Sequence, residues 1–234
     1  MIDLYYAPTP NGWKISILLE ECDIPYEVHY VNIMAGEQFE PKFLEISPNN
    51  RIPAIVDNAP ADGGKPISIF ETGAIMEYLA EKSGEFLPKD ARSKARVQQW
   101  LMWQMGGLGP MLGQHGHFKL YAPEKIPYAI ARYRKETMRL YAVLNTQLAD
   151  NAYAAGTDYS IADMAIFPWV RTYKRQEIDL NDFPNIRRWY DALKERPALR
   201  RGLDLGKEML NRNPQDSAEA RKKLFGIEDK EADK

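Results

Sequence analysis

The sequence predicts an α+β domain followed by an all-helical domain. Three observations carry this prediction. The first 84 residues alternate between strand-forming and helix-forming segments in the order βαβαββα. Residues 92–210 repeat apolar side chains at helical spacing and contain no strand-like segment. The intervening residues, 85–91, include a proline and are expected to link the two domains.

The expected strands of the first domain are short runs of aliphatic and aromatic residues bounded by turn-forming residues. They cover residues 2–6, 26–31, 52–56 and 67–70. Helical patterns predict helices over residues 13–22, 37–46 and 71–82. The first strand–helix–strand unit requires a parallel pair with a right-handed crossover, whereas the later hairpin is antiparallel. This order of elements is that of a thioredoxin-like domain.

The second domain begins with a helical segment around residues 100–108, which we expect to break at Gly106-Gly107 and Gly109-Pro110. Residues 128–148 predict a long amphipathic helix. From about residue 204 the sequence becomes polar and charged, which predicts a trailing helix and a mobile tail, the polar tail covering residues 211–234.

A helix-start signature lies at Tyr159-Ser160-Ile-Ala-Asp163. The Ser160 hydroxyl can accept a hydrogen bond from the backbone N–H of Asp163, whose carboxylate can accept one from the N–H of Ser160. The helix that follows, residues 161–170, is largely apolar. We therefore expect it at the centre of the domain.

Composition limits the classes of function. Hydrophobic residues make up 44% and charged residues 27% of the 234 residues, which is ordinary for a soluble globular protein. The net charge of −2 gives no reason to expect nucleic acid or an anionic membrane as a partner. No apolar run reaches the ~20 residues that span a bilayer, and the N-terminus lacks the regions of a signal peptide. The single cysteine, Cys22, excludes an internal disulfide, so we expect a reducing cytoplasm.

Three motifs make the expectation more specific. They are Pro8-Thr9-Pro10-Asn11-Gly12 at the first strand–helix joint, Asn49-Asn50-Arg51-Ile52-Pro53 before the third strand and Phe70-Glu71-Thr72-Gly73-Ala74 at the third helix. With residues 106–114 and the helical second domain, they resemble the cytosolic glutathione transferases over residues 1 to about 210. Within that family they resemble the bacterial Nu class, whose members act as glutathione-dependent disulfide-bond oxidoreductases. The resemblance implies glutathione as co-substrate and a homodimer in which the first domain of one chain faces the helical domain of the other.

The second and third motifs offer groups that can recognise glutathione. Pro53 stands directly before a strand and predicts a fixed turn, for which a cis bond is one solution. The resemblance implies this cis-proline, and it implies that the backbone of Ile52 pairs with the cysteinyl unit of glutathione. The N–H groups of Thr72 and Gly73 at a helix start can hold a carboxylate, and Glu71 can hold an ammonium group. In isolation, Thr72 is equally well explained as an N-cap and Glu71 as a solvated side chain.

Gln38 and Arg132 are assigned only through the resemblance. It implies that they contact the glycyl end and the second half of glutathione disulfide. Arg132 can pair with a carboxylate through two parallel hydrogen bonds. The sequence leaves open whether Arg132 serves the site of its own chain or that of a partner.

The first motif raises the question of where the reactive sulfur comes from. In thioredoxins and glutaredoxins this joint supplies a protein thiolate at a helix N-terminus. Here Thr9 and Asn11 occupy the joint, and neither can form a mixed disulfide. Their hydroxyl and amide can donate hydrogen bonds to a thiolate that the ligand supplies, or they can simply cap the helix. We expect Thr9 and Asn11 to be the catalytic residues, with the glutathione thiolate as nucleophile.

Three other features are expected to be structural. Tyr5 and Tyr6 lie within a strand, where tyrosine usually packs, although many transferases hold the thiolate with an N-terminal tyrosine. Cys22 falls on the apolar stripe of the first helix, where a small buried hydrophobe fits. His115 and His117 are two positions apart and do not share a helix face, so we expect no metal site.

The leading interpretation is glutathione-dependent reduction of small disulfides, with weak peroxidase activity through the same thiolate. Bound thiolate attacks a disulfide, a second glutathione resolves the mixed disulfide, and glutathione disulfide is held across the site. Conjugation of electrophiles is a second interpretation. A non-catalytic binding or regulatory protein is a third, since the fold alone does not determine function. Measuring the affinity for glutathione disulfide separates the third interpretation from the first two, because a pure interaction protein need not bind this ligand.

Overall fold

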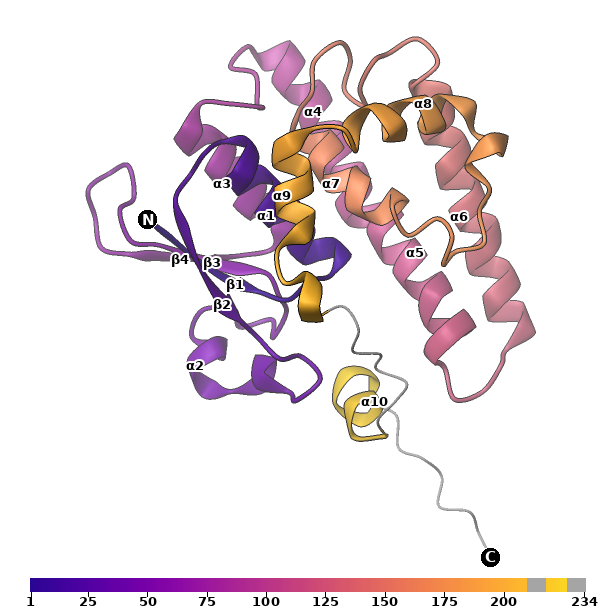
Figure 1. Ribbon diagram of the computed structural model, residues 1–234, viewed down its shortest axis with the longest axis horizontal. Coiled ribbons are helices and arrows are strands. Elements are labelled where there is room, and N and C mark those ends of the chain that lie inside the picture. Colours follow the sequence, from indigo (N-terminus) through magenta and orange to yellow (C-terminus); the bar gives the residue numbers. More distant parts are fainter. Residues whose placement is uncertain (210–217, 227–234) are drawn as a thin grey trace, which may run out of the picture.

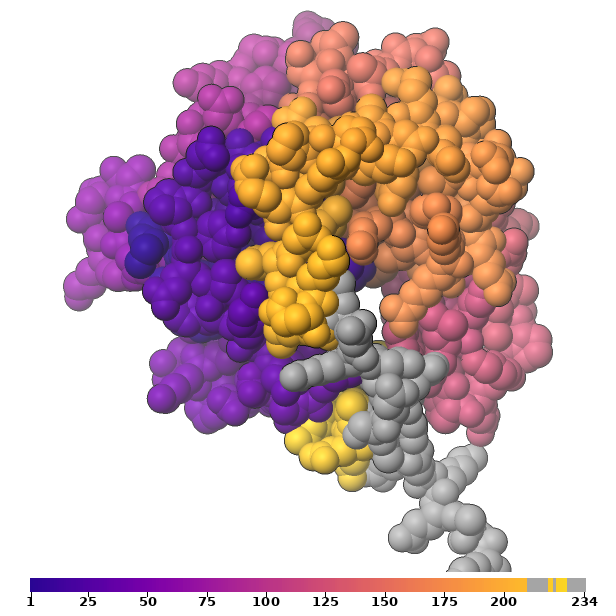
Figure 2. Space-filling view, in the orientation of Figure 1, coloured from indigo at the N-terminus to yellow at the C-terminus, as the bar shows by residue number. Residues whose placement is uncertain are grey.

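The computed structural model describes residues 1–209 and 218–226. A four-stranded sheet with its helices forms the first domain, and a group of helices forms the second (Figure 1). Helix α9 (Pro197–Asp204) returns from the helical domain and lies between the two, as its gold surface shows in Figure 2. Among the described residues, no helix combines the length and apolar character needed to cross a bilayer.

The sheet confirms the expected thioredoxin-like order. Its strands are β1 (Ile2–Tyr6), β2 (Tyr26–Tyr30), β3 (Ala54–Asp57) and β4 (Ile67–Phe70), arranged β2-β1-β3-β4. β1 pairs in parallel with β2, whereas the β1–β3 and β3–β4 pairs are antiparallel. The third strand begins at Ala54 rather than at residue 52, because Pro53 has no N–H to donate to the ladder.

The helices of the first domain differ from the prediction mainly at their starts. Helix α1 (Pro10–Glu21) begins earlier than expected, because Thr9 caps it and the fixed φ of Pro10 suits the first helical position. The expected helix over residues 37–46 is two short pieces, η1 (Glu37–Phe39) and α2 (Pro41–Leu44). Helix α3 (Thr72–Ser83) follows β4 directly.

The second domain is helical throughout its described length. Its helices are α4 (Ala91–Trp103), α5 (Gly109–Gly116), α6 (Pro127–Gln147), α7 (Ile161–Val170), α8 (Pro184–Leu193), α9 and α10 (Ala218–Phe225). Short 3₁₀ or π turns are η2 (Gln104–Leu108), η3 (His117–Tyr121), η4 (Leu180–Asp182) and η5 (Lys207–Met209). Helix α10 lies within the segment expected as a tail, of which residues 211–217 and 227–234 fall outside the described part.

The break expected at Gly106-Gly107 and Gly109-Pro110 is not present. The helical path continues from α4 through the π-helical turn η2 into α5, and the N–H of Gly109 donates to the carbonyl of Gln104. The wider hydrogen-bond spacing of a π turn accommodates Pro110, which has no N–H of its own. The prediction of a break was therefore wrong.

The expected capping box at the start of α7 is confirmed. One carboxylate oxygen of Asp163 accepts hydrogen bonds from the backbone N–H and the hydroxyl of Ser160, at 3.1 and 3.2 Å. The other accepts from the N–H of Ala154 at 2.8 Å and the indole N–H of Trp189 at 2.9 Å. Helix α7 is buried along almost its whole length, as its apolar sequence predicts.

A close helix contact fixes α1 against the helical domain. Gly202 of α9 lies on Ile17 of α1, and a Cβ at residue 202 would come within 2.6 Å of the Ile17 Cα. The Ser16 hydroxyl donates to the carbonyl of Gly202 at 2.7 Å. Because the N-terminus of α1 carries the first sequence motif, this contact positions the motif relative to the second domain.

Candidate functional site

The joint between β1 and α1 is built around Thr9. Its hydroxyl accepts a hydrogen bond from the N–H of Gly12 at 3.2 Å, and its carbonyl accepts one from the N–H of Trp13 at 2.9 Å. Gly12 has no room for a side chain, because a Cβ there would lie 2.2 Å from the Ala7 carbonyl oxygen. The turn is therefore tight, and Thr9 acts as the N-cap.

Asn11 lies in the first turn of the same helix and is tied to the second domain. Its Oδ1 accepts a hydrogen bond from the Nε1–H of Trp169 at 3.0 Å. Trp169 belongs to α7, so this bond crosses between the domains. With Oδ1 used as an acceptor, the Asn11 amide keeps its two N–H groups for another partner.

Two hollows border this joint. A cavity of about 260 Å³ is lined by Asn11, Ser47, Asn49, Arg51, Ile52, Pro53, Phe70, Glu71 and Thr72. It brings together five residues that the sequence singled out, namely Asn11, Ile52, Pro53, Glu71 and Thr72. Thr9 lines a second, larger groove of about 540 Å³ instead. The motif at residues 8–12 thus borders the cavity through Asn11 and the groove through Pro8, Thr9 and Pro10.

One wall of the small cavity is the bend at Ile52-Pro53. The peptide bond is cis, as the resemblance implied. Ile52 lies outside the strand ladder, which begins at Ala54. The Ser47 hydroxyl donates to the carbonyl of Arg51 at 2.9 Å and so fixes the approach to the bend. An extended peptide can therefore pair with the backbone of Ile52.

The opposite wall is the N-terminus of α3. Glu71 is its N-cap, at φ 70° and ψ 117°, a left-handed conformation that is costly for a residue with a side chain. The Nδ2–H of Asn49 donates to Glu71 Oε1 at 3.1 Å. The N–H groups of Thr72 and Gly73 are the first two of the helix and have no intrahelical partner. A carboxylate can accept from them while Glu71 attracts a cation beside it.

Lys14 lies beneath this wall, and the sequence analysis missed it. Its ammonium donates to the Thr72 hydroxyl at 3.3 Å and contacts Met105 Sδ at 3.5 Å, and the Thr72 hydroxyl donates to the same sulfur at 3.1 Å. Only 2% of Lys14 is exposed. Burial lowers the pKa of Lys14 to about 7, although Glu71 opposes the shift. The signal available in the sequence was its position three residues after Asn11, on the same face of the helix.

Comparisons with known proteins agree with this geometry. Residues 2–81 match the glutathione S-transferase N-terminal domain, and residues 113–197 match the glutathione S-transferase C-terminal domain. The chain is 55% identical to the disulfide-bond oxidoreductase YfcG of Escherichia coli, over 87% of this chain and 94% of that protein. The chain belongs to the glutathione S-transferase family. The expected resemblance to its bacterial disulfide-bond oxidoreductases is confirmed.

One further relative and two solved structures are also similar to this chain. The chain is 41% identical to the disulfide-bond oxidoreductase YghU of E. coli, over 86% of this chain and 73% of that protein. A glutathione transferase from Burkholderia graminis, with two glutathione molecules bound per subunit, is 44% identical over 87% of each chain, with a TM-score of 0.82. One from Pseudomonas putida, with one glutathione disulfide bound per subunit, is 42% identical over 87% of this chain and 91% of that chain, with a TM-score of 0.83.

Two residues assigned through the family resemblance lie away from the joint. Gln38 is buried in η1, and its Oε1 has no hydrogen-bond partner among the described residues. Arg132 is exposed on α6. Neither residue lines the cavity or the groove of its own chain. Their roles therefore remain proposals.

The tyrosines of β1 take no part in either hollow. Tyr6 is fully buried, and its hydroxyl donates to the carbonyl of Leu205 at 3.2 Å. Tyr5 stacks on His29 with ring centroids 4.9 Å apart. Burial raises the pKa of both hydroxyls. The structure thus agrees with a packing role.

Cys22 lies at the far end of α1 from Thr9. It is half-buried against the core, somewhat more open than the sequence predicted. Burial and nearby carboxylates raise the pKa of its thiol, which disfavours the thiolate. A 12-residue helix is about 18 Å long, so this thiol is remote from the joint.

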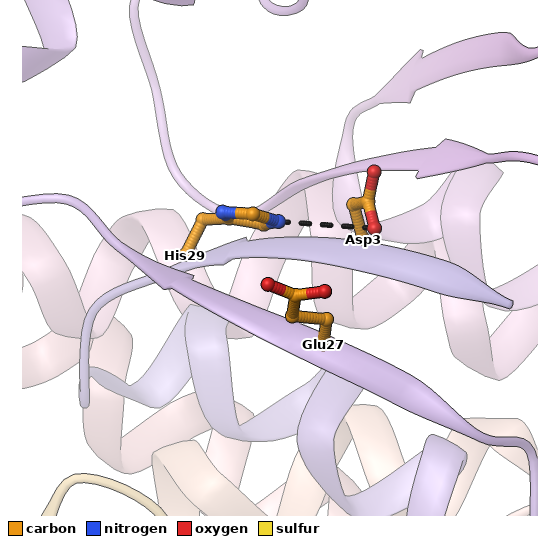
Figure 3. A group of neighbouring side chains, drawn as sticks. All are labelled: Asp3, Glu27 and His29. Atoms are coloured by element: carbon orange, nitrogen blue, oxygen red, sulfur yellow. Dashed lines mark ion pairs between the residues drawn. The ribbon is translucent and has the colours of Figure 1, made fainter.

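A cluster of possible metal ligands lies elsewhere on the sheet, where the sequence analysis considered only His115 and His117. Asp3, Glu27 and His29 extend from the paired strands β1 and β2, with ligand atoms within 4.8 Å of one another (Figure 3). Asp3 Oδ1 lies 3.7 Å from His29 Nε2, and Asp3 Oδ2 accepts a hydrogen bond from Asn58 at 2.9 Å. Asp3 thus has polar neighbours of its own on the sheet, and we assign no metal to the cluster.

Proposed function

We propose that this protein is a glutathione-dependent disulfide reductase in which the ligand, rather than the protein, supplies the sulfur. The observation that carries the proposal is the joint at Thr9 and Asn11, which offers hydrogen-bond donors but no thiol between the cavity and the groove. The hydroxyl of Thr9 and the amide of Asn11 donate to the glutathione thiolate and lower its pKa. The names of the relatives YfcG and YghU support the same chemistry.

In this proposal glutathione lies along the cavity. Its cysteinyl backbone pairs with Ile52 beside Pro53. Its γ-glutamyl carboxylate accepts from the N–H groups of Thr72 and Gly73, and its ammonium group lies against Glu71. The sulfur then reaches the joint, where the groove opens on its other side.

The reaction proceeds by two thiol–disulfide exchanges. The bound thiolate attacks one sulfur of a small disulfide, which forms a mixed disulfide and releases one thiolate. A second glutathione thiolate attacks the glutathione sulfur of that mixed disulfide and releases the other thiolate. Two electrons pass from two glutathione molecules to the substrate, and glutathione disulfide is the product. The same thiolate also supports weak reduction of peroxides.

The protein is proposed to act as a homodimer in a reducing cytoplasm. The exposed position of Arg132, away from both hollows of its own chain, supports a role in the partner's site. There it would pair with a carboxylate of glutathione disulfide, and Gln38 would contact the glycyl end of the ligand. Light scattering after size-exclusion chromatography tests the dimer.

The decisive test compares wild type with Cys22→Ala, Thr9→Val and Asn11→Ala in glutathione-dependent reduction of a small organic disulfide. We expect Cys22→Ala to keep full activity, whereas loss of either donor lowers kcat by roughly 10²-fold. Calorimetry with glutathione disulfide provides the control for binding. Loss of activity in Cys22→Ala alone contradicts the proposal, and binding without turnover in wild type favours conjugation or a binding role.

A further inference from the structure

The large groove beside Thr9 carries an unusual set of charges. It is walled by the β1–α1 joint, the loop after β2, the turn after α7 and the end of α10, which stands apart from the other helices in Figure 1. Its described lining residues are Ala7, Pro8, Thr9, Pro10, Trp13, Val31, Asn32, Ile33, Met34, Tyr121, Arg171, Thr172, Lys174, Arg175, Met209, Leu224 and Phe225. Three of these are cations, and none is an aspartate or glutamate.

The floor and far wall of the groove are apolar and aromatic. Phe225 of α10 stacks on Tyr121 with ring centroids 4.9 Å apart. The Lys223 ammonium donates to the carbonyl of Ala35 at 2.7 Å, which holds α10 on the loop after β2. Trp13 is 5% exposed, and its indole N–H has no hydrogen-bond partner among the described residues. The groove can therefore hold the apolar body of a ligand, and the indole N–H of Trp13 offers one buried donor beside it.

The cations are held by aromatic rings instead of carboxylates. The Arg171 guanidinium lies 4.7 Å from the ring centroid of Trp13, and that of Arg175 lies 5.2 Å from Tyr121. Within the described residues, no salt bridge involves Arg171, Lys174 or Arg175. A guanidinium held over a ring keeps N–H groups with which it can donate to an anion.

Other arginines of the helical domain behave differently. Arg139, Arg187, Arg196, Arg200 and Arg201 each pair with a carboxylate. Arg171 and Arg175 differ from these five, because they line the groove next to the proposed thiolate without a carboxylate partner among the described residues. Clustered charge of one sign in a cleft attracts ligands of the opposite sign.

We propose that the groove selects disulfides with an anionic group on an apolar or aromatic body, the anion pairing with Arg171 and Arg175. The body lies between Trp13 and Phe225, which places the disulfide next to Thr9. This inference rests on the proposed reductase function and adds the class of its substrate. The cations also stabilise the anionic thiol that leaves after the first exchange.

The test uses two matched substrates, dithiodibenzoate, with one carboxylate on each ring, and its neutral diamide. The ratio of their kcat/KM values, corrected for the uncatalysed reaction with glutathione, is compared between wild type and Arg171→Gln/Arg175→Gln. We expect the preference for the dicarboxylate to fall by roughly tenfold. Arg92→Gln, which removes an exposed charge outside the groove, leaves the ratio unchanged. Phe225→Ala lowers both values by a similar factor.

An unchanged ratio in the double variant overturns the charge selection while leaving the reductase function intact. If wild type reduces neither disulfide, the reductase function fails. Binding then tests whether the groove still recognises an anionic group. Calorimetry then compares thiodibenzoate, an unreactive thioether dicarboxylate, on wild type and on the double variant. A roughly tenfold loss of affinity supports the anion site, and equal affinity overturns it.

Discussion

The indole Nε1–H of Trp169 donates to Oδ1 of Asn11 at 3.0 Å, across the boundary between the two domains. An asparagine amide that accepts through its oxygen presents its nitrogen as the remaining polar group. Trp169 is itself confined, since a Cβ at residue 109 would lie 3.2 Å from its Nε1 and one at residue 113 would lie 3.4 Å from its Cη2. Helix α7 and two glycines of α5 therefore orient a side chain that belongs to the first domain.

Replacing Trp169 by phenylalanine is expected to weaken this orientation without removing the apolar packing. The Asn11 amide can then rotate, so the pKa of the bound glutathione thiol rises and kcat/KM for disulfide reduction falls by roughly tenfold. Ultraviolet absorbance of the bound thiolate, titrated against pH, measures the pKa directly. A change in stability alone does not move this titration.

The matched control combines Trp169→Phe with Asn11→Ala. If Trp169 acts through Asn11, Trp169→Phe causes no further loss of kcat/KM in the Asn11→Ala background. Equal effects of Trp169→Phe in both backgrounds contradict the positioning role.

Local patterns predicted much of this architecture. The parallel β1–β2 pair, the antiparallel β3–β4 hairpin and the capping box of Ser160 and Asp163 join segments that follow one another in sequence, and all three are confirmed. The cis bond before Pro53 followed from the family resemblance, because the residues themselves predicted only a turn. Contacts of this kind are encoded within a few residues of one another.

Long-range contacts could not be predicted in the same way. Trp169 and Asn11 are separated by 158 positions, and neither pattern nor spacing connects them. Lys14 is a polar residue between the apolar positions of α1, for which the sequence suggests exposure to solvent. Its burial depends on Met105 of η2, which is distant in sequence and contacts its ammonium group. The π turn itself was interpreted as a break, because glycine and proline usually end a helix.

Lys14 is expected to make stability depend on pH. Its pKa is about 7 in the folded protein and 10.5 when unperturbed, so between these values the unfolded chain binds more protons. Stability contributed at this site therefore rises with pH through that window and is lowest below pH 7, where the ammonium is charged while buried. Relative to Lys14→Met, wild type should gain up to about 1.4 kcal/mol per pH unit.

Urea unfolding of both proteins at several pH values between the two pKa values measures this difference. Subtracting the two curves removes the contribution of distant groups, including the tyrosines. Glu71 is the charged neighbour that opposes the shift, so Glu71→Gln should extend the pH dependence of stability below pH 7, and this variant is also measured there. A flat difference curve shows that Lys14 is not desolvated.

Asp163 is expected to be the most sensitive polar position of the helical domain. Replacement by alanine leaves the N–H groups of Ala154, Ser160 and Trp189 without their acceptor in a buried site. We expect a loss of about 3 kcal/mol or more in the free energy of unfolding. Asp163→Asn keeps one oxygen as an acceptor and should lose less. Chemical denaturation of wild type, Asp163→Asn and Asp163→Ala tests this order of stability. Loss of side-chain volume alone does not explain a loss in Asp163→Asn, because asparagine has nearly the same volume as aspartate.

Glu71 combines a backbone cost with a proposed binding role, and two substitutions separate them. Its left-handed φ of 70° suits glycine and penalises any residue with a Cβ. Glu71→Ala removes the carboxylate but keeps the backbone cost, whereas Glu71→Gly removes both. We therefore expect Glu71→Gly to be more stable than Glu71→Ala by about 1 kcal/mol. Both variants also lose the hydrogen bond from Asn49, so this contribution cancels in the comparison.

The two variants should bind glutathione equally poorly, since both lack the group proposed to hold its ammonium. Thermal unfolding without ligand measures the stability difference, and calorimetry with glutathione measures the affinity. If Glu71→Ala binds as tightly as wild type, the carboxylate does not recognise the ligand. If Glu71→Gly is no more stable than Glu71→Ala, the left-handed backbone at residue 71 carries no cost in stability.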